Sequence, residues 1–435
     1  MFIFNSDTRR RFGNWFGPGG APVWQEHGYP RVSINVLKAK RMKADLYIAQ
    51  YKSSLLNDVI PFWEKNSVDH QDGGFYTSLT RDGSVFDTDK FVWLQARQVW
   101  TFSMLYNCVD SRKEWQDMAI HGAEFLKKYG RDESGNWYFS LDKSGRPLVQ
   151  PYNIFSDCFA AMGFGQLSQA TRADEYGEIA YRTFRNILAK QDNPKGSYSK
   201  GFPGTRPLKS FSLPMILSNL VLEIEHLLPA AVVEETIDKA IHEVMNVFYQ
   251  PDINLILENV QPDGSRSDSY EGRVINPGHG LEALWFIMDL AARRNDRALI
   301  EKATGIALNI LEYGWDKENG GIFYFLDHLG KPPLQLEWDQ KLWWVHAEAI
   351  VCMLKAYRHT GREDCKNWFV KLHAYTFKHF ADPEYGEWFG YLNRAGEVLL
   401  PLKGGKWKGC FHVPRSLYQA WKTLETIQKQ EATIL

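Results

Sequence analysis

Two histidines stand close to the beginning of apolar stretches that have helical periodicity. His279 lies in NPGHGLEALW and His412 lies in KGCFHVPRSLY. The imidazole ring has an unperturbed pKa of about 6.5, so it takes up or releases a proton near neutral pH. Two such rings on opposite faces of one carbon atom allow deprotonation from one side and reprotonation from the other.

An arginine and a glutamate occupy comparable positions in two other apolar stretches. Arg97 lies in FVWLQARQVW, where Trp93 and Trp100 at i−4 and i+3 predict an aromatic cradle for the guanidinium group. Glu348 lies in KLWWVHAEAI. A fixed cation such as Arg97 would stabilise the enediolate oxygen that forms when a carbon next to a carbonyl loses its proton. This set suits proton transfer on a sugar.

Further polar side chains accompany these four, and each has a second interpretation. Glu282 follows His279 by three residues and faces the same way on a helix, either orienting the imidazole or forming a buried strut with it. Arg415 follows His412 by one turn and would bind a ligand oxygen or a neighbouring helix. Lys341 and Trp344 share a helical stripe with Glu348, and Lys341 either lines the site or neutralises a carboxylate.

A turn signature with a period of about 60 residues repeats along the chain. It begins at Asp72, Asp132, Asp192, Asp252, Asp316 and Asp382, at intervals of 60, 60, 60, 64 and 66 residues. Most copies hold an aromatic pair and an Asp-Gly or Asn-x-x-Gly corner, which predicts a short β-hairpin. The third and fourth copies are degenerate. Such a period is typical of a repeat architecture.

Two helical patterns accompany each signature. Charged amphipathic patterns precede the turns, at 45–65, 115–129, 175–190 and 367–380. More apolar patterns follow the turns, at 91–106, 157–171, 214–226, 280–292, 342–359 and 414–427. We therefore predict an all-α fold in which six hairpin-linked helix pairs close into an (α/α)6 barrel, with an open solenoid as the rival.

In a closed barrel, the first residues of the six apolar helices would all lie at the same end and point into one central funnel. From each turn Asp to the first polar residue of the next apolar helix the count is 25, 25, 27, 27, 32 and 30 residues. These residues are Arg97, Asp157, Asn219, His279, Glu348 and His412. All except Asp157 are predicted to converge on one pocket. Asp157 and Asn219 have a second interpretation as helix caps or core hydrogen-bonding residues, and this interpretation is favoured for Asp157. His346 would point elsewhere.

Composition excludes several classes of partner and cofactor. The 435 residues carry a net charge of −1, which gives no basic footprint for nucleic acid or an anionic membrane. No run approaches the roughly 18 apolar residues of a membrane span. There is no HExxH motif or metal-ligand spacing, no GxxxxGK[ST] or GxGxxG loop and no GxSxG elbow. We expect no required metal and no bound dinucleotide.

The chain is predicted to hold one catalytic domain, residues 41–435, after a poorly ordered extension at residues 1–40. The extension has three consecutive arginines but no apolar core of a signal peptide, and we expect it to be dispensable. Five cysteines at irregular spacing are typical of reduced thiols in a cytoplasm.

Four segments resemble, in order and spacing, the signature segments of the N-acylglucosamine 2-epimerase family. They are FVWLQARQVW, PGHGLEALW, KLWWVHAEAI and KGCFHVPRSLY, and the similarity runs from about Met42 to Ile427. The form of these segments looks most like that of the bacterial N-acetylglucosamine 2-epimerases. The resemblance implies interconversion of N-acetyl-D-glucosamine and N-acetyl-D-mannosamine by ring opening, removal of the C2 proton and reprotonation on the other face.

The resemblance also implies roles for individual residues. His279 and His412 would be the acid–base pair, Arg97 and Glu348 would bind and polarise the substrate, and Glu282 would support His279. ATP as an allosteric activator, a homodimer and a cytoplasmic setting are implied by the resemblance. The rivals are another epimerase or aldose–ketose isomerase of the same barrel, such as a cellobiose 2-epimerase, an (α/α)6 glycoside hydrolase that uses Glu282 and Glu348, and a binding protein without activity.

Overall fold

Helices of two kinds alternate along the chain in the computed structural model, which describes residues 44–195, 198, 202 and 204–433. The outer helices are amphipathic, each burying one face. They are α2 (Ala44–Ser54) with α3 (Ile60–Asn66), α5 (Lys113–Tyr129), α7 (Asp174–Lys190), α9 (Ala230–His242), α12 (Arg297–Gly314) and α14 (Glu363–His379). A π-helical turn at Leu55–Val59 joins α2 to α3.

The inner helices are buried on nearly every side over much of their length, as expected of helices surrounded by other helices. In α13, for example, every residue from Trp343 to Ala356 is buried. The inner helices are α4 (Val92–Cys108), α6 (Ile154–Thr171), α8 (Ser212–Glu223), α11 (Pro277–Arg293), α13 (Trp343–Thr360) and α15 (His412–Thr433). Apart from the short helix α10 (Tyr270–Arg273), the described α-helices thus form the six predicted pairs.

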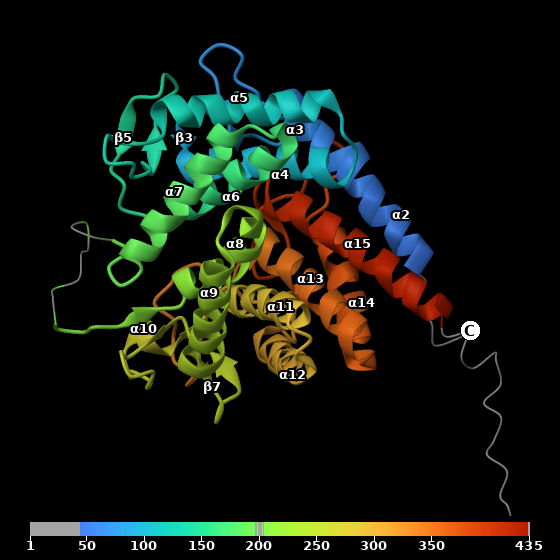
Figure 1. Cartoon of the computed structure of the whole chain (residues 1–435). Helices are drawn as coiled ribbons and strands as arrows, with labels where there is room; N and C mark the ends of the chain where they lie inside the picture. Colours follow the sequence, from blue (N-terminus) through green and yellow to red (C-terminus); the bar gives the residue numbers. More distant parts are fainter. Residues whose placement is uncertain (1–43, 196–197, 199–201, 203, 434–435) are drawn as a thin grey trace, which may run out of the picture. The chain divides into compact units, whose positions relative to one another are not determined.

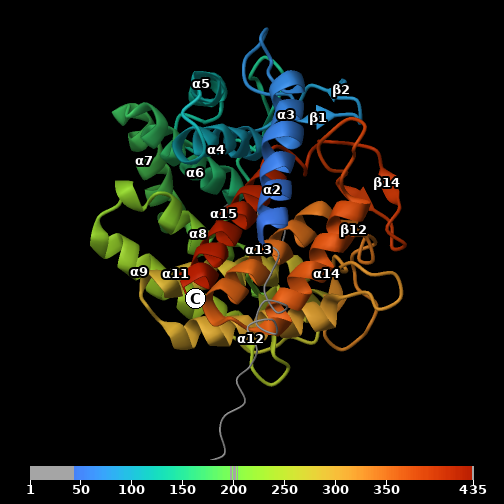
Figure 2. The same cartoon turned by 90° about the vertical axis from the view of Figure 1, so that its right-hand side faces the viewer.

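The inner helices form a closed ring, with the outer helices around it (Figures 1 and 2). Helices α4, α6, α8, α11, α13 and α15 pack in that order, each against the next. The ring closes between α4 and the start of α15, where Thr101 donates a hydrogen bond to the carbonyl oxygen of Cys410 at 2.7 Å. The rings of Trp100 and Phe411 are 5.2 Å apart at the same junction. This closure confirms the barrel and excludes the open solenoid.

Short antiparallel strands lie in the loops. Four pairs connect through tight turns within one repeat: β1 with β2, β4 with β5, β7 with β8 and β13 with β14. Their bounds are Ser78–Leu79, Val85–Asp87, Ser140–Leu141, Pro147–Val149, Tyr249–Gln250, Leu255–Ile256, Tyr391–Leu392 and Val398–Leu400. The remaining strands are β3 (Lys90–Phe91), β6 (Lys209–Ser210), β9 (Asn259–Val260), β10 (Val274–Ile275), β11 (Leu326–Asp327) and β12 (Lys341–Leu342).

Pairing between repeats fixes where each inner helix begins. Strand β3 pairs with β4, β6 with β9, β10 with β11 and β12 with β13. Directly after three of these strands, the first amides of the segment leading into the inner helix bond to the next repeat: Val92 to Phe139, Phe211 to Glu258 and Trp343 to Gly390. The loops of one repeat therefore position the helix start of the preceding repeat.

Buried lysine–aspartate pairs tie several turns to the segment that leads into the next inner helix. The pairs are Lys90 with Asp69, Lys341 with Asp316 and Lys403 with Asp382, at 2.6, 3.0 and 2.8 Å. In the first repeat the aspartate at this position is thus Asp69, three residues before the Asp72 from which the sequence repeat was counted.

Most predicted helices agree with the structure to within a few residues, with one consequential difference. The helix expected from residue 342 begins at Trp343, and Lys341 lies in strand β12 before it. Lys341 therefore does not share a helical stripe with Trp344 and Glu348. The predicted extension at residues 1–40 falls outside the described residues. No helix among the described residues is long and apolar enough to cross a membrane.

Candidate active site

His412 and Glu348 form a buried dyad between two inner helices. His412 is the first residue of α15, and its Nδ1 lies 2.8 Å from Oε1 of Glu348 on α13. The Glu348 side chain is fully buried and His412 is 8% exposed. An ionised carboxylate only accepts hydrogen bonds, so Nδ1 carries the proton. Nε2 of the neutral ring is left as a lone-pair base.

Arg415 holds two carboxylates of the cluster. Its Nη2 donates to Oε1 of Glu348 at 2.7 Å and to Oε1 of Glu282. Oε2 of Glu348 accepts a hydrogen bond from the indole of Trp285 at 2.9 Å. Burial works against the charge of Arg415, but the two carboxylates outweigh it and raise its pKa. A guanidinium held in this way fixes the orientation of Glu348 and thereby that of His412.

A second histidine–carboxylate dyad is built around His279. This residue lies in the first turn of α11, where Asn276 caps the helix by accepting a hydrogen bond from the His279 amide. Its Nδ1 lies 2.9 Å from Oε2 of Glu258, a residue between strands β8 and β9. Glu282, which the sequence placed beside His279, binds Arg415 instead. Glu282 therefore does not orient the imidazole of His279, although its charge raises the pKa of that ring.

The two dyads have opposite electrostatics. Burial acts to lower the pKa of His279, but the charge of Glu258, its hydrogen bond and the charge of Glu282 raise that pKa above the usual value. Burial lowers the pKa of His412 well below the usual value, and the charges of Arg97 and Arg415 add to this effect. His279 thus holds its proton more strongly than a free imidazole does, and His412 holds its proton less strongly.

Trp344 links the two histidines. Its ring centroid is 5.1 Å from that of His279 and 5.8 Å from that of His412, with interplanar angles of 36° and 37°. Tyr324 packs edge-on against the same indole at 6.1 Å. Both imidazoles therefore lie against one aromatic wall. Indole rings commonly provide the apolar surface of such a site.

Arg97 is a buried cation without a carboxylate partner among the described residues. The guanidinium carbon lies 4.4, 3.8 and 4.7 Å from the ring centroids of Trp93, Phe159 and Phe411. Trp100, expected in this cradle, instead donates to Glu223 at 2.8 Å. Burial lowers the pKa of Arg97 to about 9, although the charge of Glu282 opposes this shift. A buried cation in this state favours an anionic ligand or reaction intermediate.

Asn219 and Asp157 do not cap their helices. Asn153 caps α6, and α8 has no side-chain cap. Both residues are buried, and each has an Oδ1 atom without a hydrogen-bond partner. The nearest cation to Asp157 is Lys190, at 3.9 Å, on the outer helix α7. Burial raises the pKa of Asp157 to about 7.

Lys341 and His346 have structural partners. The Lys341 ammonium is fully buried and binds Asp316, so the carboxylate-neutralising interpretation describes its contacts. His346 accepts a hydrogen bond from the Ile322 amide at 2.9 Å through Nε2, and its Nδ1 donates to Leu342 at 2.8 Å. Burial lowers the pKa of His346 to about 3. As predicted, His346 does not join the other histidines.

A metal ion in this cluster would compete with Arg415 for the two carboxylates. Ligand atoms of Glu282, Glu348 and His412 lie within 4.8 Å of one another. Arg415 already donates to both carboxylates, so the positive charge there comes from the protein itself. These contacts give no separate support for a metal centre.

Glu258 is the residue that sequence reasoning missed. Two residues after the paired position of the turn, four other repeats have Thr77, Phe139, Tyr324 and Gly390. A carboxylate at this position of the repeat is a sequence signal for Glu258. The signal was not recognised because the fourth repeat departs from the turn signature.

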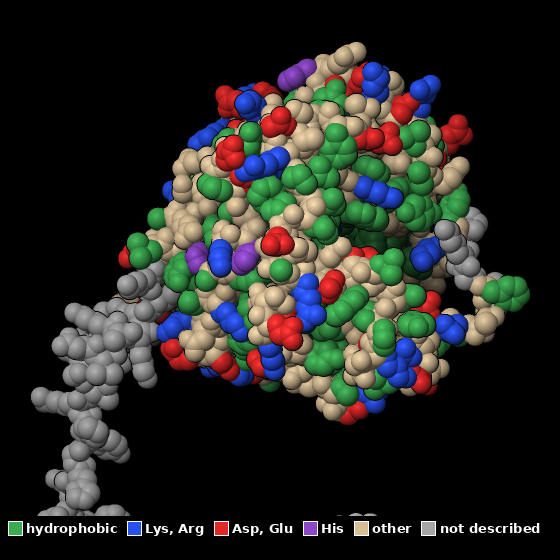
Figure 3. Space-filling model, turned by 180° about the vertical axis from the view of Figure 1, so that it is seen from behind, with side chains coloured by type: hydrophobic (Ala, Val, Ile, Leu, Met, Phe, Trp, Pro, Cys, Tyr) green, Lys and Arg blue, Asp and Glu red, His purple; other side chains and the backbone are tan. Residues whose placement is uncertain are grey.

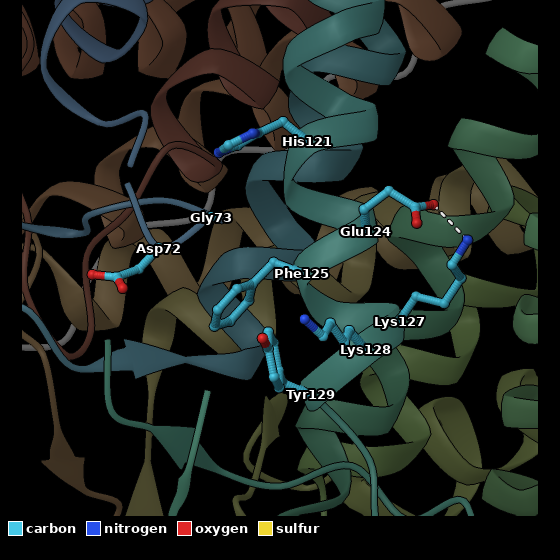
Figure 4. Close-up of a pocket in the computed structure, with 8 residues that line it drawn as sticks. All are labelled: Asp72, Gly73, His121, Glu124, Phe125, Lys127, Lys128 and Tyr129. Atoms are coloured by element: carbon cyan, nitrogen blue, oxygen red, sulfur yellow. Dashed lines mark ion pairs between the residues drawn. The ribbon is translucent and has the colours of Figure 1, made fainter. Parts of the chain in front are cut away.

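The surface of the molecule has hollows. The face shown in Figure 3 is hollowed, and hydrophobic side chains dominate the rim of the hollow. A separate pocket of about 670 Å³ lies between the turn at Asp72 and helix α5 (Figure 4). There, Lys127 pairs with Glu124 at 2.7 Å, and Nε2 of His121 lies 3.0 Å from the carbonyl oxygen of Asp69. Two of the charged groups that line this pocket thus pair with each other.

Comparison with known sequences shows to which family this chain belongs. Residues 74–414 match the profile of the family described as N-acylglucosamine 2-epimerase. The chain is 41% identical over 378 residues to the N-acylglucosamine 2-epimerase of Rattus norvegicus, covering 83% of this chain and 88% of that one. This chain belongs to the N-acylglucosamine 2-epimerase family. It is a sugar epimerase, as predicted.

This member of the N-acylglucosamine 2-epimerase family also has more distant relatives. The cellobiose 2-epimerase of Bacteroides fragilis is 24% identical over 382 residues, which cover 83% of this chain and 95% of that one. The solved structure of the cellobiose 2-epimerase from Bacillus thermoamylovorans B4167 superposes with a TM-score of 0.75 at 20% identity, covering 87% and 99% of the two chains. This superposition shows the shared barrel fold. The predicted likeness to bacterial N-acetylglucosamine 2-epimerases stays a prediction.

Proposed function

We propose that this protein interconverts N-acetyl-D-glucosamine and N-acetyl-D-mannosamine. The observation that carries the proposal is the pair of histidine–carboxylate dyads against one tryptophan, in a chain about 40% identical to N-acylglucosamine 2-epimerases. Epimerisation at C2 needs a base on one face of the carbon and an acid on the other. In each dyad the carboxylate binds Nδ1, so Nε2 is the ring atom left for the substrate.

The reaction begins on the open-chain aldehyde. One imidazole removes the C2 proton, and the electron pair of the broken bond forms a double bond between C1 and C2 while charge moves onto O1. Arg97 is the group we assign to that oxygen, because its buried guanidinium has no carboxylate partner within the described residues. The other imidazole then delivers a proton to the opposite face of C2.

Five residues are assigned to orientation and substrate binding. Arg415 and Glu348 fix the ring of His412, and Glu282 balances the charge of Arg415. Trp344 supplies the surface on which the sugar lies, and Asn219 offers an unpaired buried oxygen to a substrate hydroxyl or amide. Lys341 has no place in this scheme because Asp316 occupies it.

The other members of the barrel family are the nearest alternatives, and a glycoside hydrolase is a more distant one. A glycosidase needs two carboxyl groups free to act on the bond between two sugars. Glu282 and Glu348 are buried, and both bind Arg415. This arrangement favours epimerase chemistry over hydrolysis.

Three further properties belong to the proposal through the family resemblance. They are activation by ATP without hydrolysis, a homodimeric assembly and a cytoplasmic location. All five cysteines are unpaired, which is typical of a reducing compartment.

Proton NMR of N-acetyl-D-mannosamine mixed with the protein, with and without ATP, tests the proposed function. We expect the anomeric signals of N-acetyl-D-glucosamine to appear. A parallel panel of cellobiose, mannose and unacylated glucosamine defines the substrate class. Conversion of cellobiose or mannose with no conversion of the N-acetylated sugar would overturn the proposal in favour of a relative of the same barrel.

A further inference from the structure

We propose that Glu258 is a positioning residue that makes His279 the proton donor of the resting site and leaves His412 as its base. This inference rests on the proposed epimerase function. Its physical basis is the contact of 2.9 Å between Oε2 of Glu258 and Nδ1 of His279. A carboxylate at this distance directs the Nδ1 proton toward itself and favours the imidazolium form, which leaves Nε2–H to act on the substrate.

The backbone holds Glu258 in place. Its amide donates to the carbonyl oxygen of Val274 at 3.1 Å, and its own carbonyl accepts from the Phe211 amide at 2.9 Å. These bonds tie the residue both to the segment before α11 and to the start of α8. Its side chain is 14% exposed and that of His279 is 26% exposed. The carboxylate is therefore fixed by two neighbouring repeats beside the imidazole.

The charged groups around the two histidines differ in sign. His279 is faced by Glu258 from the loop between β8 and β9, by Glu282 from its own helix and by His412 from α15. Arg97 from α4 and Arg415 from α15 act on His412, together with Glu282 and the bound Glu348. Two carboxylates act on each ring, but two arginines act on His412 alone, and this difference favours His279 as the site of the single proton of the pair.

The two protonation states define a balanced reaction. Nε2 of neutral His412 takes the C2 proton, the C2–H electron pair forms the C1–C2 double bond, and the carbonyl pair moves to O1 beside Arg97. Nε2–H of His279 then protonates C2 on the other face, and the pair on O1 restores the carbonyl group. His412 ends charged and His279 neutral. Proton exchange with solvent returns the site to its starting state, without any oxidant or reductant.

Glu258 has a role beside His279 that Glu282 does not fill. Glu282 is bound to Arg415, so it raises the pKa of His279 only through space and does not orient the ring. The remaining ring atom of His279, Nε2, has no hydrogen-bond partner among the described residues. Without Glu258, neither nitrogen would be fixed, and both tautomers would compete.

The test uses Glu258→Gln, which keeps an oxygen acceptor but removes the charge. We expect kcat to fall about 10-fold or more with a much smaller change in KM. The alkaline limb of the kcat/KM profile, which reports loss of the proton from the pair, should move down by about one pH unit. Glu258→Asp should recover part of the rate. Glu271→Gln removes an exposed carboxylate that pairs with Arg206 from the neighbouring loop, and should change neither quantity.

NMR titration of ¹⁵N-histidine in the wild-type protein keeps the test independent of how the variants fold. We expect the His279 ring to stay protonated to a higher pH than the His412 ring. An unmoved alkaline limb in folded Glu258→Gln, or a His412 ring that is protonated first, would overturn the inference while epimerase activity stands. Loss of the proposed function has a different signature, which is a wild-type protein that converts no N-acetylated sugar.

Discussion

His412 meets Glu348 at 2.8 Å across two inner helices, and each residue is placed by a different repeat. The two residues lie far apart in sequence, and packing of α13 against α15, the inner helices of neighbouring repeats, creates the dyad. The same packing brings Arg415 onto Glu348, and Arg415 also binds Glu282 on α11. Catalysis in this protein is thus inferred to depend on contacts between repeats.

Substitution of either histidine should abolish most activity without unfolding the protein. We expect His412→Asn and His279→Asn to lower kcat by about 10²–10⁴-fold, the usual contribution of general acid–base catalysis. His242→Asn, at an exposed position on α9, is the matched control and should keep the wild-type rate. Wild-type epimerisation by either active-site variant would contradict the two-base scheme.

Substitution of Arg97 should lower activity without lowering stability. Because its buried charge has no carboxylate partner, Arg97→Met removes an unfavourable desolvation and should leave the melting temperature unchanged or higher. The same change should lower kcat by about 10²–10³-fold, since the charge on O1 loses its cation. Thermal unfolding and steady-state kinetics measure the two effects. A marked loss of stability with normal kcat would show that Arg97 is structural.

Substitution of Lys341 should lower stability and leave activity nearly unchanged. Lys341→Met leaves Asp316 buried with only Arg394, at 3.3 Å, to offset its charge. We expect a loss of about 3 kcal/mol in the free energy of unfolding, the lower end for a broken buried ion pair. Kinetic parameters of the folded variant should be close to wild type. The double variant Lys341→Met with Asp316→Asn should recover part of the stability, and failure to do so would argue against this pairing.

Buried His346 predicts a loss of stability in acid. Its pKa is about 3 in the folded protein and about 6.5 in the unfolded chain, so the unfolded state binds more protons between these values. Its contribution is therefore complete above pH 6.5 and falls as pH is lowered, on the order of 3 kcal/mol by pH 4. Urea unfolding from pH 7 to 4 measures this slope. His346→Gln should flatten the slope, whereas an unchanged slope would assign the acid sensitivity to other groups.

Sequence periodicity predicted the repeat, the helix pairs and the residues at the helix starts because all of these depend on local spacing. It placed Arg97 in an aromatic cradle but chose Trp100, whereas the rings that complete the cradle, Phe159 and Phe411, come from other repeats. Lys341 was assigned to a helix because its apolar neighbours continue the helical pattern, while pairing with β13 makes it a strand residue.

The side-chain contacts between different repeats could not be predicted from the sequence. Glu282 was assigned to His279 from helical spacing alone, but Arg415 on α15 competes for it. Glu258 could not be linked to His279 because their proximity depends on how the loop folds back toward the start of α11. Local pattern thus identifies the candidate residues, and tertiary packing decides which of them meet.

The most direct test of the two-base scheme is epimerisation of N-acetyl-D-mannosamine in D2O, stopped early and analysed by proton NMR. The account predicts deuterium at C2 of nearly all of the N-acetyl-D-glucosamine formed, with protium retained at C2 of the recovered substrate. This pattern requires one group to remove the proton and a second, solvent-exchanged group to replace it. Product that keeps protium at C2 would contradict the account.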